Sequence, residues 1–162
     1  MTNKERFLTA LRRGTPDAVP YWEQGINESC IIAAASHFTD DLPPNKLIHE
    51  MDLAEQIKLL VTLKNLVEEL DMDAMTVPTL TGRELLGGNK LRDKLGIITQ
   101  VTPHGEPFPI GGPIAGESDL DGFRLPVPDD SFLMAIQFAV SSLGGRRAVV
   151  LHSPGTFKLS WA

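Results

Sequence analysis

Three short apolar runs, separated by longer segments of helical character, constrain the fold of this chain most. They cover residues 19–22, 74–77 and 148–151. Apolar runs of this length, bounded by Pro, Gly or Asp, are typical of buried strands. Strands that alternate with helices predict parallel βαβ units, so we expect an α/β protein.

The segments between these runs predict helices and one hairpin. Thr2 and Glu5 have the spacing of a capping box, and Asp52 precedes apolar residues that recur every three or four positions. We expect helices over residues 3–13, 28–38 and 53–70, and a fourth that begins after Asp129 or Asp130 and ends at Gly144 and Gly145. Residues 97–110 predict a β-hairpin that turns at "PHGEP".

Composition excludes several classes of partner. The net charge is -6 with a pI near 5.1, and no stretch gathers Lys and Arg, so we expect no nucleic-acid partner. No apolar run approaches the roughly 20 residues that span a bilayer, so we expect no membrane partner and a cytoplasmic location. The single cysteine, Cys30, lies in an apolar helical segment and is expected to be an inert core thiol rather than a ligand.

Three segments together resemble the uroporphyrinogen decarboxylase family, which also contains corrinoid-dependent methyltransferases. They are "NKERFLTALRRGTPDAVPYWE", "GGPIAGESDLDGFRLPVPD" and "VVLHSPGTFKLSWA". The resemblance implies that residues 1–162 are the N-terminal portion of a barrel domain. The expected fold is a partial TIM (β/α)8 barrel, with about the first three barrel strands and an inserted β-hairpin. Another chain or self-association would then cover the exposed barrel edges.

The resemblance favours the methyltransferase branch. The decarboxylases carry an arginine-bearing loop after strand one and an aspartate after strand two, where this chain has "EQGINES" and "PTLTGRE". The implied function is methyl transfer between a corrinoid carrier and a small substrate, in a complete protein. Two alternatives stay open. One is uroporphyrinogen decarboxylase, a lyase of porphyrin biosynthesis; the other is a non-catalytic truncated or split chain that binds a ligand or pairs with another subunit.

The candidate site follows from the rule that barrel enzymes place their chemistry at the carboxyl ends of strands. Glu23 could accept a proton or hold a cation there, or could be a solvated loop residue. His152 could be a general acid or a metal ligand, or could bond a backbone carbonyl. The expected substrate-binding residues are Glu23, Gln24, Asn27, Thr79, His152, Ser153 and Thr156.

No catalytic residue and no metal ligand is assigned from the sequence. Zinc and a corrinoid are implied by the resemblance for a complete protein, with a corrinoid protein as a partner. The family's zinc is held by one His and two Cys from later strands, and this chain has no such cluster.

Overall fold

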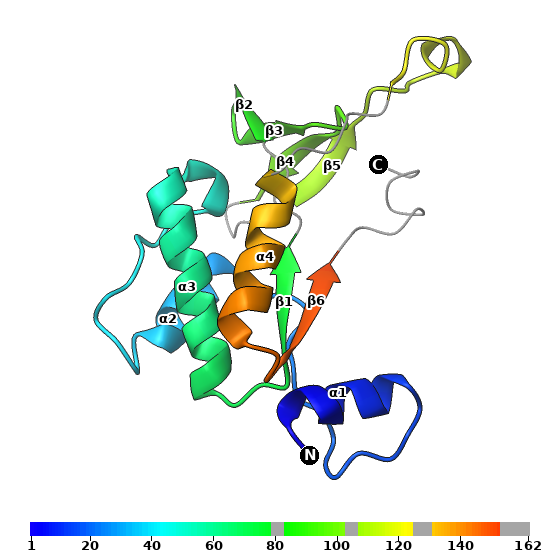
Figure 1. Ribbon diagram of the computed structural model, residues 1–162. Coiled ribbons are helices and arrows are strands. Elements are labelled where there is room, and N and C mark those ends of the chain that lie inside the picture. Colours follow the sequence, from blue (N-terminus) through cyan, green and yellow to red (C-terminus); the bar gives the residue numbers. More distant parts are fainter. Residues whose placement is uncertain (79–82, 103–106, 125–130, 153–162) are drawn as a thin grey trace. The chain divides into compact units, whose positions relative to one another are not determined.

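The computed structural model describes residues 1–78, 83–102, 107–124 and 131–152 (Figure 1). The chain divides into two compact units, which we treat separately. The first unit is Met1–Thr79 with Leu133–His152, and the second is Leu80–Phe132 with Ser153–Ala162.

Helices and strands are described here in chain order. The helices are α1 (Asn3–Leu11), α2 (Glu28–Ala35), α3 (Leu53–Glu69) and α4 (Ser131–Leu143), with short 3-10 helices η1 (Ile48–Glu50) and η2 (Glu117–Asp119). The strands are β1 (Ala74–Pro78), β2 (Arg83–Gly87), β3 (Lys90–Asp93), β4 (Ile98–Val101), β5 (Pro107–Gly111) and β6 (Ala148–His152).

The expectation of a partial TIM barrel is wrong. β1 and β6 form a two-stranded parallel sheet, while β2, β3, β4 and β5 form a separate four-stranded antiparallel sheet. Residues 19–22, the expected first barrel strand, form no strand. The described part of the chain is therefore a mixed α/β structure with two small sheets.

Residues 19–22 fail to form a strand for a local reason. Pro20 has no N–H to give to a ladder. Among the described residues, one backbone hydrogen bond joins this segment to the residues around β1. Asp73 N–H donates it to the Tyr21 carbonyl over 2.7 Å. Side chains make the remaining connections. Residues 19–22 form neither helix nor strand, so their apolar composition does not produce strand pairing.

The helices of the first unit begin where the capping signals place them. Thr2 and Glu5 form a capping box at α1, and Asp52 and Glu55 form another at α3. Each saves two backbone N–H groups from going unsatisfied. The helices stop a little earlier than expected, and the left-handed residue after α1 is Arg13 (φ 61°), not Gly14.

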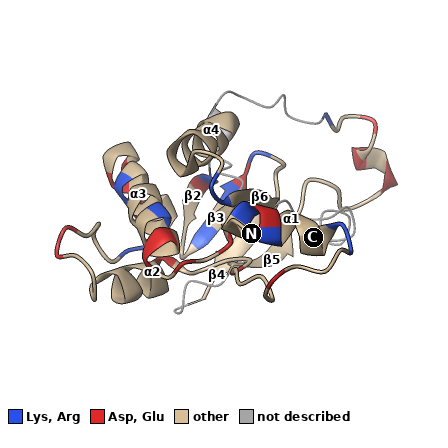
Figure 2. Ribbon diagram, turned by 60° about the horizontal axis from the view of Figure 1, so that its bottom comes forward, with Lys and Arg blue, Asp and Glu red and all other residues tan. Residues whose placement is uncertain are grey.

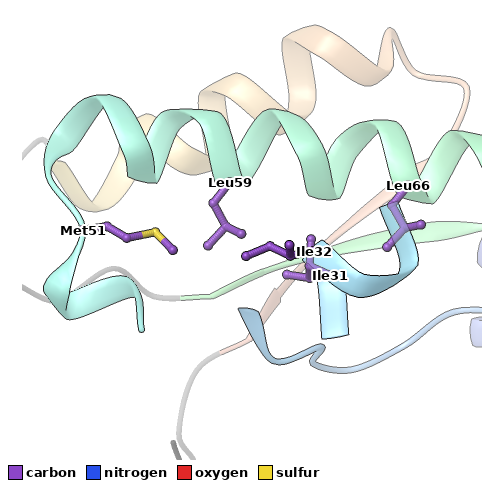
Figure 3. Packing of buried hydrophobic residues seen from close by; sticks show 5 residues of the cluster. All are labelled: Ile31, Ile32, Met51, Leu59 and Leu66. Atoms are coloured by element: carbon purple, nitrogen blue, oxygen red, sulfur yellow. The ribbon is translucent and has the colours of Figure 1, made fainter. Parts of the chain in front are cut away.

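The core between α2 and α3 explains why the stripe of α3 is apolar. Ile31 and Ile32 of α2 pack with Leu59 and Leu66 of α3, and Met51 closes the cluster beside η1 (Figure 3). All five side chains are buried. Burial of apolar area at roughly 25 cal/mol per Å² holds the helices together.

The second unit contains one strand pairing that was expected and two that were not, because β3 pairs antiparallel with β4 as well as with β2. β4 and β5 pair antiparallel, which confirms the expected hairpin; residues 103–106 of its turn lie outside the described residues. β2 and β3 pair across "GGN", where Gly87, Gly88 and Asn89 all have positive φ. Gly and Asn in this order are typical of hairpin turns.

Charge is distributed without a strongly basic or acidic helix in the first unit. Figure 2 shows basic and acidic segments alternating along α1 and α3. On α3, Lys64 pairs with Glu68 one turn later. Such pairs stabilise a solvated helix face modestly, by about 0.3–0.5 kcal/mol each.

Candidate functional site

The carboxyl ends of β1 and β6 lie at the same edge because the two strands run parallel. The register pairs Val77 with Leu151 and Pro78 with His152. His152 is exposed at this end. In parallel α/β sheets, ligands bind outside the carboxyl ends of the strands, so this edge is the candidate site.

Residues 21–23 are held next to β1 by two polar side chains, Asp73 immediately before the strand and Thr76 within it. The buried Asp73 accepts a hydrogen bond from Tyr21 N–H through Oδ2, over 2.6 Å. Thr76, in the middle of β1, donates its hydroxyl hydrogen to the Glu23 carbonyl over 2.8 Å. We call Asp73, Thr76 and these two bonds the polar clip. It brings Glu23 next to a strand whose end pairs with His152.

Arg6 of α1 bonds to Asp73 of the polar clip and to Asp17. Its Nη1 donates to Asp73 Oδ1 over 2.7 Å, and its Nε donates to Asp17 over 2.8 Å. The hydrogen bond with Asp17, and then the one with Asp73, raises the pKa of the Arg6 guanidinium. The same bond from Arg6, and then the bond from the amino terminus of Met1, holds the pKa of Asp17 well below its ordinary value.

An aromatic contact fixes the residue next to Glu23. The rings of Phe7 in α1 and Trp22 meet edge to face, with centroids 5.6 Å apart and planes at 86°. Edge-to-face pairs add about 0.5–1.5 kcal/mol beyond the area they bury. Residues 21–23 are thus held on both sides, by α1 through Phe7 and by β1 through the polar clip.

The structure places four of the seven expected site residues. Glu23, Gln24 and Asn27 are exposed between the polar clip and α2, and His152 is exposed at the end of β6. Asn27 is the N-cap of α2, where its side chain makes no capping bond. Thr79, Ser153 and Thr156 lie outside the described residues. Of these four, His152 lies at the end of β6 and Glu23 is bonded to β1 through its carbonyl.

The strand register sets how far Thr76 lies from His152. Thr76 pairs with Val150, two residues before His152. Strand spacing then puts the Cα atoms of Thr76 and His152 roughly 8 Å apart. Thr76 in turn holds the carbonyl of Glu23 through its hydroxyl.

Sequence reasoning missed the residues that build the polar clip. Asp73 stands in "DMDA" as one of two neighbouring acids, and nothing in the sequence separates the buried Asp73 from the exposed Asp71. Thr76 is the one polar residue inside the otherwise apolar β1. That isolated polar residue in an otherwise apolar strand was the available signal, because side-chain hydroxyl groups in such places commonly bond to the main chain.

The expectation for Cys30 is wrong. The thiol is exposed, although its neighbours Ile31 and Ile32 are buried. α2 makes about two turns and turns only one face toward α3, so an apolar run of six residues inevitably leaves some of its members outside.

Among the residues that the structure describes, no group of three or more His, Cys, Asp or Glu side chains is placed to hold a metal ion. Over the same residues, no helix is long and apolar enough to cross a membrane.

Comparisons of this chain with protein-family models, with curated protein sequences and with solved structures found no match.

Proposed function

We propose that the edge at the carboxyl ends of β1 and β6 binds a small substrate, and that the chain is a uroporphyrinogen decarboxylase-like protein of the methyltransferase branch. Its reaction would be methyl transfer between a corrinoid carrier and a small acceptor or donor, in a complete protein. The strand-end residues carry this function without a barrel fold.

One observation carries the proposal: Glu23 is tied by its carbonyl to β1, whose last residue pairs with His152. Two of the three segments that carry the family resemblance therefore contact β1, one through the Glu23 carbonyl and the other through strand pairing. Within the described residues, the Glu23 carboxylate makes no hydrogen bond or ion pair, so it is free to accept a proton or a hydrogen bond from a ligand. His152 would donate or accept a hydrogen bond on the other side.

The corrinoid, when bound, would supply or receive the methyl group. This chain's own contribution would be to bind and orient the small substrate between Glu23 and His152. A cytoplasmic location belongs to the proposal, because a free, exposed thiol at Cys30 suits a reducing compartment. A corrinoid protein would then be the macromolecular partner.

The test is an activity assay on the product of the complete reading frame, with methylcobalamin and a panel of thiols and methylamines. We expect corrinoid-dependent turnover, and a fall in kcat/KM on the order of 100-fold for Glu23→Gln. Glu69→Gln is the matched control, since Glu69 is also an exposed carboxylate without a partner among the described residues. Absence of corrinoid-dependent turnover across the panel would overturn the proposal.

A second candidate function is pairing with another chain through β6. Among the described residues β1 is the one strand that pairs with β6, and Leu151 on β6 is 46% exposed. An uncharged edge strand is a template for a further strand. Sedimentation velocity should show a species heavier than 17.7 kDa that Leu151→Lys returns to the monomer. A monomer at all concentrations would contradict self-association.

A further inference from the structure

We infer that Asp73 and Thr76 are positioning residues of the candidate site: they hold the main chain of residues 21–23 beside β1 and thereby set the position of Glu23. The inference rests on the proposed function in one respect, since it takes Glu23 as a substrate-binding group.

Backbone pairing alone does not hold residues 21–23 in place. One backbone hydrogen bond, from Asp73 N–H to the Tyr21 carbonyl, joins them to the described residues around β1. A strand in the same place would be held by a ladder of such bonds. The two side-chain bonds of the polar clip therefore supply most of the hydrogen bonding that places residues 21–23.

Both carboxylate oxygens of Asp73 accept hydrogen bonds. Its Oδ1 accepts from Arg6 and its Oδ2 accepts from Tyr21 N–H, and the side chain is 3% exposed. A buried carboxylate with charged and amide donors on both oxygens is oriented rigidly. Asp73 is thus placed to position the chain rather than to touch a substrate.

Thr76 bonds the main chain of Glu23. Its hydroxyl bonds the carbonyl of Glu23 and not the carboxylate. The bond therefore restrains the backbone of Glu23 while its carboxylate stays free for a ligand. The neighbours of Thr76 in β1, Met75 and Val77, are fully buried and hold the strand itself in place.

The experiment uses Trp22 as a reporter, in the Trp161→Phe background that leaves it as the single tryptophan. Thr76→Val removes the hydroxyl and keeps the shape of the side chain. We expect Trp22 to become more accessible to acrylamide and the Tyr21 and Asp73 amide protons to exchange faster. Thr76→Ser, which keeps a hydroxyl, should restore both.

The matched control is Thr62→Val. Thr62 also donates its hydroxyl to a backbone carbonyl over 2.8 Å, but to Lys58 within α3. If the two Thr→Val variants change Trp22 quenching and amide exchange equally, or if Thr76→Val changes neither, the inference is overturned. These measurements need no ligand, so their failure is distinct from the failure of the proposed function.

The activity assay then tests the link to the site. With the methylcobalamin panel, Thr76→Val should lower kcat/KM on the order of 10- to 100-fold through displacement of Glu23. Thr76→Ser should recover it and Thr62→Val should not change it. Full activity of Thr76→Val together with a loosened Trp22 would refute a positioning role.

Discussion

Asp73 is a residue at which burial, charge and main-chain geometry meet. It lies immediately before β1, and its carboxylate joins α1, through Arg6, to the segment that leads to Glu23. A buried carboxylate is tolerated where its oxygens are bonded, and removing it leaves its donors without an acceptor.

Asp73→Ala should therefore lower the free energy of unfolding by about 2–3 kcal/mol, because Tyr21 N–H and one Arg6 nitrogen lose their acceptor. Urea unfolding measures this. Asp40→Ala is the control, since Asp40 is exposed and should stay within about 0.5 kcal/mol of the parent. Equal effects of the two substitutions would argue that the bonds of Asp73 add nothing to stability.

Cys30 gives a second test at the scale of one residue. Its thiol is exposed, so Ellman's reagent should modify it in the folded protein without denaturant. If the thiol reacts only after the protein unfolds, Cys30 is buried and the prediction is wrong.

At the scale of elements, the α2–α3 pair depends on its buried cluster. Leu66 is 2% exposed, whereas Leu53, on the same helix, is 62% exposed. We expect Leu66→Ala to cost about 2–5 kcal/mol, because it removes buried methyl groups and leaves a cavity. Leu53→Ala should cost less than about 0.5 kcal/mol. Chemical unfolding of both variants checks the packing in Figure 3, and a small loss at Leu66 would refute it.

Across the whole molecule, ion pairs tie distant segments of the first unit together. Asp17 is bonded by Arg6 and by the amino terminus, and Asp71 is bonded by Arg147 and then by Asn3. These bonds lower the pKa of both carboxylates in the folded state. Glu68, bonded by Lys64 and near Arg146 and Arg147, has a lowered pKa as well.

A lowered pKa in the folded state fixes the sign of the pH dependence. The stabilisation is fully present above the unfolded-state value of about 4 and is lost as the pH falls through the folded-state pKa. The free energy of unfolding should therefore decline from about pH 5 toward pH 2. Asp17→Asn and Asp71→Asn should each flatten that decline, whereas Asp40→Asn should not. Urea titrations at several pH values measure it; parallel curves for all variants would contradict the assignment.

Local signals in the sequence predicted most helices and half of the strand pairing. The capping boxes at Thr2 and Asp52, the stripe of α3 and the Gly pair after α4 act within a few residues, so they can be read locally. The β2–β3 hairpin was overlooked although its "GGN" turn was readable. The barrel failed as a prediction because it depended on whether residues 19–22 pair with a distant strand.

The sequence by itself determined where the helices begin, that β1 and β6 are short apolar strands, and that Glu23 and His152 follow apolar runs. Only the tertiary structure decided that residues 19–22 form no strand, that Asp73 and not Asp71 is buried, and that Thr76 reaches Glu23. Capping and periodicity are interactions between near neighbours. A hydrogen bond between residues 53 positions apart depends on the path of the chain between them, which no local pattern encodes.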